Sequence, residues 1–367
     1  MEEVISQPAG GAKKRIFWQR IKRKILKHVW LVRAGIIAGV ALGIFLMVWL
    51  VNLLVGKSIF GTYFLLVRDF VFTPEGKIES FEGTTNILVL GKGGEGHEAP
   101  DLTDTIIYLS VTHKPQAAYL ISIPRDIWIA QIRAKVNSAY YWGNVRQEGG
   151  GMVLAKSTVE EIVGQPIHYA IVIDFAAFKK VIDILGGVEV EVERSFVDEK
   201  YPIPGRENDE CGGDKEFKCR YEKVTFEKGL RVMDGEAALK FVRSRNAQGE
   251  EGTDIAREAR QQKVIAAIKN KVLSSEIALS PRKLLALFEV AKDHIETDMP
   301  APAAAIVARR IFQAKNKIST YVVPENYLLN PPTSPRYDNL YVFIPQAGDW
   351  EEVHSWVGCI ISGGLCE

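Results

Sequence analysis

Hydrophobic residues are most concentrated near the start of the chain, in one uninterrupted run. Residues 34–55 contain no Lys, Arg, Asp or Glu, and Asn52 is their one polar side chain. As a helix this run would be about 33 Å long, which matches the hydrocarbon core of a bilayer. We therefore predict a transmembrane helix over residues 34–55.

Two other interpretations of this run are weaker. A secretory signal peptide usually has a shorter apolar stretch and a cleavage site of small residues, and neither is evident here. A buried helix of a globular domain is rarely this long without any charge. We therefore expect an uncleaved membrane anchor.

The charges that flank the run predict its orientation. Nine Lys and Arg lie within residues 1–33, against two Glu. Positive charge of this kind keeps the flank in the cytoplasm. We expect a single-pass protein of the cell membrane, with a cytoplasmic basic tail (1–33), a juxtamembrane linker (56–83) and the rest of the chain outside the cell.

After residue 84, short apolar strands alternate with helical segments. The predicted strands are 86–91, 105–112, 117–123, 167–173 and 188–192, and the predicted helices are 151–162, 175–185, 235–243, 254–274, 281–293 and 302–315. This alternation predicts an α/β fold, in which a layered α-β-α domain with a mixed central sheet covers residues 84–319.

Two segments fit this pattern less well. Residues 195–222 are polar and look like an insertion or long loop. Residues 320–367 carry two strand-like stretches around a Pro-rich loop, and we expect them to form a small C-terminal appendage.

Composition narrows the classes of function. Apolar residues make up 47% of the chain and charged residues 25%, which excludes a largely disordered protein. The net charge of +1 is unevenly distributed, because the chain from Gly56 onward carries 37 Lys and Arg against 43 Asp and Glu. A net acidic domain is unsuited to nucleic acid, and we expect no nucleic-acid partner.

The four cysteines lie in two local pairs. Cys211 and Cys219 flank a polar segment, and Cys359 and Cys366 lie near the C-terminus. Four cysteines allow three pairings, of which the two local bridges are the simplest. A zinc site is the rival, but neither pair has CxxC spacing. Disulfides are favoured because the predicted location is outside the reducing cytosol.

The densest polar cluster lies in residues 242–262. Asp254, Arg257 and Gln261 fall on one face of a predicted helix, whereas Arg260 projects to a different side. Arg243 and Arg245 flank Ser244 just upstream. A solvated face capped by Asp254 is the alternative, but planar guanidinium groups suit phosphate oxygens, and several together suit a pyrophosphate.

Two smaller clusters follow predicted strands or loops. Asp101 and Asp104 end a Gly-rich loop and are able to hold Mg²⁺, which takes one or two protein carboxylates; two Asp in a loop are otherwise common turn residues. Arg125 and Asp126 directly follow a strand end, which is a favoured ligand position in α/β sheets.

Taken together, these segments resemble the LytR-CpsA-Psr family of membrane-anchored cell-envelope enzymes. The matching segments are NILVLG, LTDT, ISIPRD, KVNSAYYWGN, DFAAFKKVIDILGGVEVEVE, MDGEAAL, FVRSR and the DxxRxxRQ pattern. They cover about residues 84–275. The resemblance implies an enzyme that transfers a glycopolymer from a polyprenyl-pyrophosphate carrier to peptidoglycan by Mg²⁺-assisted phosphoryl transfer.

The resemblance also implies roles for individual residues. Asp104 matches the metal-associated aspartate of the family, and the pyrophosphate-binding positions match Arg125, Arg243, Arg245, Arg257, Arg260 and Gln261. Asp254 is the leading carboxylate of the DxxRxxRQ helix. The chain departs from the family where Gly91-Lys92-Gly93 replaces a GxD pattern and where Leu102 replaces an arginine.

This departure leaves the second metal ligand open. Asp101 or Glu95 is a candidate to replace the missing carboxylate, and Lys92 is an alternative source of positive charge.

The chemistry requires positive charge around the transferred phosphoryl group and a base for the attacking sugar hydroxyl. Arg125 would supply charge, and Asp254 or Asp126 would act as the base. Two alternatives remain. The protein is a non-catalytic module that binds glycopolymer or carrier lipid, or it is a lipid pyrophosphate phosphatase that uses water as the acceptor.

Overall fold

The structure, a computed structural model, describes residues 29–55, 59–94, 99–364 and 366. The chain divides into two compact units, Met1–Leu65 and Leu66–Glu367. Helix α2 (Val29–Val55) belongs to the first unit, and α3 (Ile59–Phe72) continues into the second. Within the described residues, none of the helices is both long enough and apolar enough to cross a membrane. The transmembrane helix over residues 34–55 stays a prediction.

A six-stranded mixed sheet forms the centre of the second unit. Its strand order is β11-β6-β1-β2-β3-β12. The strands are β1 (Thr84–Lys92), β2 (Thr103–Thr112), β3 (Ala117–Ser122), β6 (Tyr169–Asp174), β11 (Ile295–Thr297) and β12 (Ile318–Val322). The pairs β1–β6 and β3–β12 are parallel, and the other three pairs are antiparallel. The predicted α/β fold with a mixed central sheet is confirmed.

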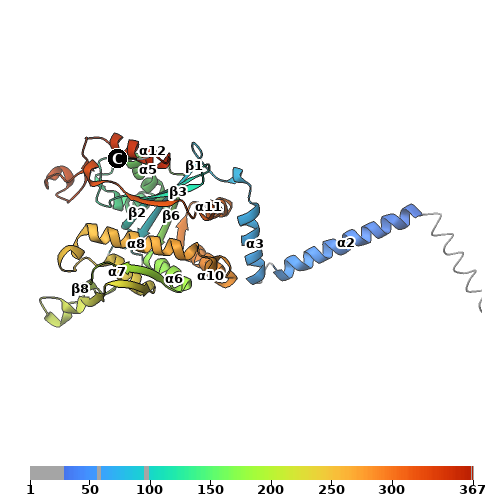
Figure 1. The fold of residues 1–367 in the computed structure, drawn as a ribbon, viewed down its shortest axis with the longest axis horizontal. Helices are drawn as coiled ribbons and strands as arrows, with labels where there is room; N and C mark the ends of the chain where they lie inside the picture. The colour runs from blue at the N-terminus through green and yellow to red at the C-terminus, as the bar shows by residue number, and fades with distance from the viewer. Residues whose placement is uncertain (1–28, 56–58, 95–98, 365, 367) are drawn as a thin grey trace, which may run out of the picture. The chain divides into compact units, whose positions relative to one another are not determined.

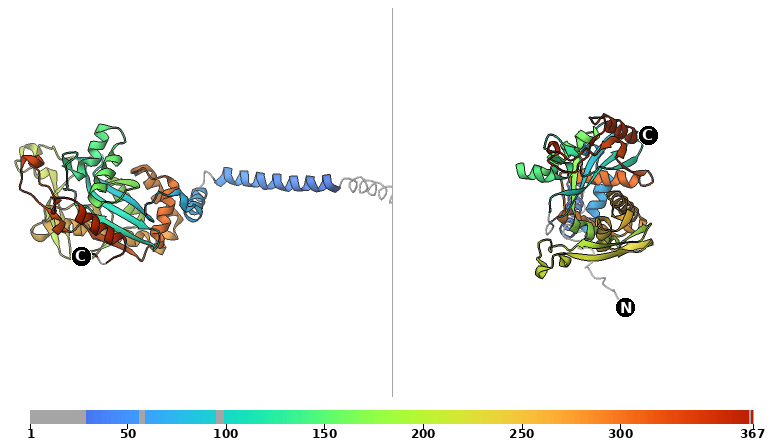
Figure 2. Two further views of the ribbon diagram at one scale, coloured as in Figure 1. Left: turned by 90° about the horizontal axis from the view of Figure 1, so that it is seen from above. Right: turned by 90° about the vertical axis from the view of Figure 1, so that its left-hand side faces the viewer.

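Helices cover both faces of this sheet (Figure 1). On one face lie α4 (Ala139–Arg146), α5 (Gly151–Val163) and α12 (Glu351–Ile361), whose apolar residues pack with Leu88, Leu90 and Tyr108 in the largest hydrophobic core. On the other face lie α6 (Phe175–Leu185), α7 (Gly235–Arg243), α8 (Asp254–Val272), α10 (Pro281–His294) and α11 (Ala301–Gln313). Figure 2 shows the sheet between the two helical layers.

Helices α6, α7, α8 and α10 also share a second hydrophobic core, away from the sheet, with β7 (Val188–Val192). The close approach of α7 to α6 depends on Gly235. A Cβ atom at this position would lie 2.3 Å from the carbonyl oxygen of Lys179. Any side chain here would therefore clash with α6.

The polar segment 195–222 is more ordered than expected. It contains β8 (Phe196–Pro202) and the start of β9 (Tyr221–Phe226), which pair as an antiparallel hairpin, and β10 (Gly229–Met233) then pairs with β7. Disulfides join Cys211 to Cys219 and Cys359 to Cys366. The local pairing is therefore confirmed. The rival zinc site is wrong, because a disulfide leaves no thiolate to bind metal.

The C-terminal segment is not a separate appendage. Residues 320–322 belong to β12 at the edge of the main sheet, and Trp356 and Val357 of α12 lie in its largest core. The remaining short elements are β4 (Trp128–Ile129), β5 (Ala134–Lys135), β13 (Leu328–Leu329), β14 (Ile344–Pro345) and α9 (Ser275–Ala278). The expected boundary at residue 319/320 is corrected, because it would cut through a strand.

Candidate functional site

The loop after α7 positions two of the predicted arginines. Arg243 is the last residue of α7, and Ser244, which is fully buried, ends the helix. The backbone N–H groups of Arg245 and Asn246 both donate to Oδ2 of the buried Asp198, at 3.1 and 3.2 Å. A buried carboxylate that accepts several backbone hydrogen bonds fixes the chain strongly. Asp198 thereby determines where Arg245 leaves the backbone.

Arg243 lies against two aromatic rings. Its guanidinium carbon is 4.6 Å from the centre of the Phe175 ring, and its Nη1 donates to the Tyr201 hydroxyl at 3.4 Å. Burial raises the pKa of Tyr201 to about 12, so its hydroxyl stays neutral and accepts this bond. These contacts orient the guanidinium group by stacking as well as by charge.

Arg260 has a different environment from the other arginines. It is buried, and its guanidinium group donates to the backbone oxygens of Phe241, Glu251 and Ser244 at 3.0, 2.8 and 2.6 Å. Burial lowers the pKa of Arg260, and the ion pair with Glu251 opposes this effect. Its predicted role in binding pyrophosphate is therefore replaced by a positioning role, because its N–H groups hold the loop after α7.

Helix α8 supplies Arg257 and Gln261. Thr253 caps the helix by accepting from the N–H of Ala256 at 3.2 Å. Arg257 is buried, yet it lines the same two cavities as Gln261. Asp254 is the first residue of α8, but its side chain lies outside the described residues, so its role as a base stays a prediction.

Asp104 is the carboxylate around which the arginines gather. Its Oδ1 accepts from Nη1 of Arg125 at 2.5 Å, and its Oδ2 lies 3.8 Å from Nη2 of Arg245. Arg245 is more than 100 residues away from the other two along the chain, whereas Asp104 and Arg125 are 21 residues apart. The structure therefore brings Asp104, Arg125 and Arg245 together.

Asp126 is held by two cations. Its Oδ1 accepts from Nζ of Lys135 at 2.7 Å, and its Oδ2 lies 3.4 Å from Nε of Arg125. Asp126 therefore contacts Arg125 and helps to orient its guanidinium group. Its role as a base stays a prediction.

Lys92 and Asp101 belong to a separate ionic cluster. Nζ of Lys92 donates to Glu296 at 2.8 Å and to Asp101 at 3.2 Å, and the Tyr140 hydroxyl donates to the other oxygen of Glu296. Burial alone would lower the pKa of Lys92, but its hydrogen bond to Glu296 raises it above its ordinary value. Asp101 is thus engaged by a lysine, and Glu95 lies outside the described residues.

Three cavities meet at Thr105 and Gln261. The arginine cavity, about 240 Å³, is lined by Arg243, Arg245 and Arg257 and by Asp104 and Glu207. The C-terminal cavity, about 560 Å³, is lined by Arg125, Arg257, Asp104, Asp126 and Glu258 and by residues between Val322 and Phe343. Both cavities contain Asp104, so the charged residues face a shared space.

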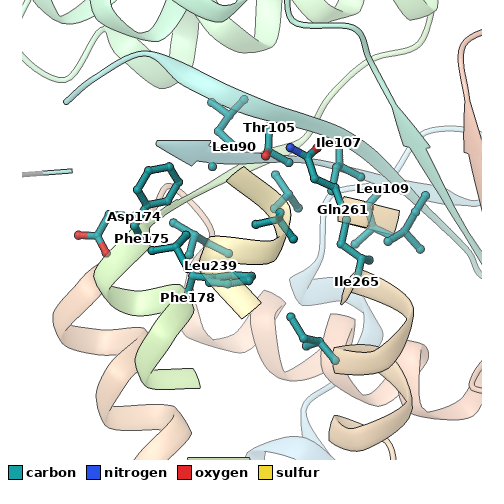
Figure 3. A pocket seen from close by; sticks show the side chains of 16 residues that line it. Leu90, Thr105, Ile107, Leu109, Asp174, Phe175, Phe178, Leu239, Gln261 and Ile265 are labelled. Atoms are coloured by element: carbon teal, nitrogen blue, oxygen red, sulfur yellow. The ribbon is translucent and has the colours of Figure 1, made fainter. Parts of the chain in front are cut away.

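The third, the apolar cavity, has a volume of about 250 Å³. Figure 3 shows its walls, which come from the sheet and from α6, α7 and α8: Leu90, Ile107, Leu109, Phe175, Phe178, Leu239 and Ile265. Gln261 also lines the cavity (Figure 3) and is shared with both charged cavities. The apolar cavity therefore lies next to the arginine cavity.

Several residues that line or support the site escaped the sequence analysis. Glu258 lies one turn after Asp254, so the helical spacing that selected Arg257 and Gln261 contained a signal for it. Asp198 stands in a strand with no motif, and only its burial and its contacts reveal its role. Glu325 and Tyr341 come from the segment that was expected to be an appendage.

Comparison with known proteins gives the chain its relatives. The teichoic acid transferase TagU of Oceanobacillus iheyensis is 29% identical over 239 residues, which are 64% of this chain and 65% of the relative. TagT of Bacillus subtilis is 32% identical over 200 residues, 52% of this chain and 54% of the relative. TagV of the same organism is 28% identical over 260 residues, which are 68% of this chain and 58% of the relative. The chain thus matches about half to two thirds of their length. All three are named polyisoprenyl-teichoic acid–peptidoglycan teichoic acid transferases.

Solved structures share the fold. The crystal structure of Bacillus subtilis TagV has a TM-score of 0.54 at 24% identity and covers 78% of this chain and all of that one. TagT bound to LIIa-WTA has a TM-score of 0.51 at 22% identity and covers 79% of this chain and 96% of that one. The LytR_cpsA_psr family matches residues 72–355, which include the whole sheet and all the arginines described above, and the protein is a member of this family.

Proposed function

We propose that this protein transfers a glycopolymer from a polyprenyl-pyrophosphate carrier to peptidoglycan. The observation that carries the proposal is the meeting of the arginine cavity with the apolar cavity at Thr105 and Gln261. A polyprenyl pyrophosphate has the same two parts, an apolar chain next to a doubly charged head. The named activity of the relatives agrees with this reading.

The apolar cavity would hold the lipid chain. Its exposed lining is almost entirely apolar, and it is walled by aromatic and aliphatic side chains such as Phe175 and Leu239. An apolar chain gains about 0.8 kcal/mol per buried CH₂ group. The sequence named no residues for such a groove, because these positions are indistinguishable from ordinary core residues before the fold is known.

The arginines would bind the pyrophosphate and neutralise the leaving phosphate. Arg243 would reach it from the end of α7 and Arg245 from the loop that follows, whereas Arg257 would come from α8 and Arg125 from the loop after β3. Guanidinium groups contact two phosphate oxygens at once. In the transfer, an acceptor hydroxyl oxygen bonds to the phosphorus next to the sugar, the bond from this phosphorus to the bridging oxygen breaks, and polyprenyl phosphate leaves.

The proton of the attacking hydroxyl needs a carboxylate acceptor. Asp254 was predicted for this role, and Glu258, which is one turn further along the same helix, lines the C-terminal cavity. Asp126 is occupied by Lys135 and Arg125. We therefore assign the base to the carboxylates at the start of α8.

Asp104 fits the requirements of a Mg²⁺ ligand. It lines both charged cavities, and Mg²⁺ commonly takes one protein carboxylate and completes its shell with water and substrate phosphate. When bound, the ion would supply further positive charge at the transferred phosphoryl group. Asp101 is a weaker candidate, because Lys92 already donates to it.

We also propose that residues 34–55 anchor the protein in the cell membrane, with the N-terminus in the cytoplasm. Large apolar side chains of α2 are solvent-exposed, among them Ile37 (69%), Phe45 (64%) and Met47 (69%). Exposure of many large apolar side chains on one helix is unfavourable in water and favourable in lipid. The basic residues 1–33 support the orientation.

A transfer assay with the full chain in detergent tests the proposal. Polyprenyl-pyrophosphate-linked sugar, labelled in the sugar, is incubated with and without peptidoglycan sacculi, and both sacculus-bound label and released polyprenyl phosphate are measured. We expect label in the sacculi. Lipid phosphate released at the same rate without sacculi would identify a phosphatase, and binding without release would identify a non-catalytic module.

A further inference from the structure

The C-terminal cavity has a different chemistry from the arginine cavity. Four carboxylates line it against two arginines, whereas three arginines line the arginine cavity against two carboxylates. A phosphate-bearing donor is therefore favoured in the arginine cavity. The C-terminal cavity suits a neutral ligand that is rich in hydroxyl groups, because carboxylates accept hydrogen bonds from hydroxyls.

One wall of this cavity carries an aromatic pair in which Tyr341 is exposed and Phe343 is partly buried. The Tyr341 side chain is 55% exposed, and its ring centre lies 5.4 Å from that of Phe343 in an edge-to-face arrangement. A ligand that covers an exposed aromatic ring removes apolar surface from water, which favours binding. The apolar C–H face of a pyranose is a surface of matching size and shape. Glu325 and Asn330 line the same cavity with polar groups.

The wall is fixed to the reaction centre by backbone hydrogen bonds. The N–H of Phe343 donates to the carbonyl oxygen of Asp126 at 3.0 Å, and the N–H of Trp128 donates to the carbonyl oxygen of Phe343 at 2.8 Å. The amide nitrogen of Asn330 donates to the carbonyl oxygen of Val342 at 2.8 Å. The aromatic pair therefore keeps a set position relative to Arg125, which is the residue next to Asp126.

We propose that the C-terminal cavity is the subsite for the acceptor glycan, in which Tyr341 stacks on a pyranose ring and Glu325 accepts from its hydroxyls. The inference rests on the proposed function and adds the location of the acceptor. A sugar ring on Tyr341 would share one cavity with Asp104, Arg125 and Glu258. An acceptor hydroxyl held there has access to the phosphorus and to a base.

The chain offers a matched control for Tyr341. Tyr141 on α4 is also exposed, at 40%, and it also has an edge-to-face aromatic neighbour, Trp142, at 5.1 Å. Tyr141 lines none of the three cavities described here. The variants Tyr341→Ala and Tyr141→Ala therefore remove the same side chain from similar surroundings, inside and outside the subsite.

The test measures two affinities by titration calorimetry with the full chain in detergent. The acceptor probe is a soluble tetrasaccharide of alternating N-acetylglucosamine and N-acetylmuramic acid in which the lactyl carboxylates are amidated, so that it is neutral. The donor probe is short-chain polyprenyl-pyrophosphoryl-N-acetylglucosamine. We expect Tyr341→Ala to weaken acceptor binding about 10-fold and to leave donor binding unchanged. Tyr341→Phe keeps the ring and should bind like the parent, as should Tyr141→Ala.

The affinities of the variants for the two probes distinguish an acceptor subsite from a donor subsite. If Tyr341→Ala binds the acceptor as tightly as Tyr141→Ala does, or if the parent binds no acceptor, the subsite is wrong. If the loss falls on the donor probe, the cavity binds the donor sugar and the acceptor assignment is wrong. Donor binding by the parent is independent of Tyr341, and its absence would instead contradict the proposed function.

Discussion

The carboxylate of Asp104 reduces the electrostatic repulsion between the arginines of the site. Several arginines that gather without an anion repel one another, and Asp104 supplies negative charge between Arg125 and Arg245. A bound pyrophosphate would bring more negative charge to the same place. Asp104 thus serves two purposes, since it holds the arginines together and offers an oxygen ligand to a cation.

Substitution of Asp104 and of the nearby Asp101 should show which of the two carboxylates binds Mg²⁺. We expect Asp104→Asn to abolish Mg²⁺-dependent transfer, because a neutral amide neither pairs with the arginines nor binds Mg²⁺ strongly. Asp101→Asn should keep Mg²⁺ dependence, because Asp101 contacts Lys92. The measurement is transfer rate against Mg²⁺ concentration. If Asp101→Asn changes the Mg²⁺ dependence of the transfer rate and Asp104→Asn does not, Asp101 is the metal ligand and the assignment to Asp104 is wrong.

Helical spacing was enough to sort the residues of α8. Arg257 and Gln261 line the same cavities, and Arg260 points elsewhere, as the 100° turn per residue predicts. The spacing did not reveal what Arg260 contacts. Its partners are the backbone oxygens of Phe241, Ser244 and Glu251 and the Glu251 carboxylate, which lie 9 to 19 residues upstream and outside the helix. Helical spacing does not encode such contacts.

At the scale of elements, the most informative feature is that strand β8 fixes the position of the loop after α7. The loop after α7 carries Arg245, and Asp198 of β8 holds its backbone. The sequence predicted an insertion or long loop over residues 195–222 because this segment is polar and carries two cysteines. The hairpin that forms there brings a buried carboxylate to the arginines.

We expect Asp198→Asn to weaken pyrophosphate binding although Asp198 lines none of the three cavities. The amide offers one oxygen and presents an N–H₂ group where the carboxylate accepted bonds. The loss of buried hydrogen bonds should lower the free energy of unfolding by about 1–3 kcal/mol. Calorimetry with inorganic pyrophosphate and urea unfolding would measure the two effects.

Asp209→Asn is the control, since Asp209 is exposed within the same segment. Its affinity and stability should match the parent. A variant Asp198→Asn that loses stability but binds pyrophosphate like the parent would show that the loop needs no such support.

At the scale of the whole molecule, the layers were predictable and the C-terminal boundary was not. Alternating strands and helices with clear caps, such as Asp174 and Gly186, specify the order of elements. The strand β12 is short and lies at the sheet edge, and its pairing with β3 joins residues about 200 positions apart. The appendage was therefore predicted from local composition, and the long-range pairing corrects it.

Two partly buried histidines should make the stability of the domain depend on pH. Burial lowers the pKa values of His113 and His168. The unfolded chain therefore binds more protons than the folded chain at a pH below about 6.5, and the free energy of unfolding should fall as pH decreases through this range. Urea unfolding between pH 7.5 and 5 measures the slope. The double variant His113→Gln/His168→Gln should have a shallower slope, and an unchanged slope would exclude these two residues as its source.

The central claim is that the arginines bind the pyrophosphate of a lipid carrier at the mouth of the apolar cavity. The most direct measurement is the affinity of the full chain for a short-chain polyprenyl pyrophosphate, by titration calorimetry, for Arg243→Ala, Arg245→Ala and their Lys counterparts. Arg231→Ala, which removes an exposed arginine of β10, is the control. The account predicts a loss of about 10- to 150-fold for each Ala variant and partial recovery with Lys. Parental affinity in both Arg243→Ala and Arg245→Ala would contradict it.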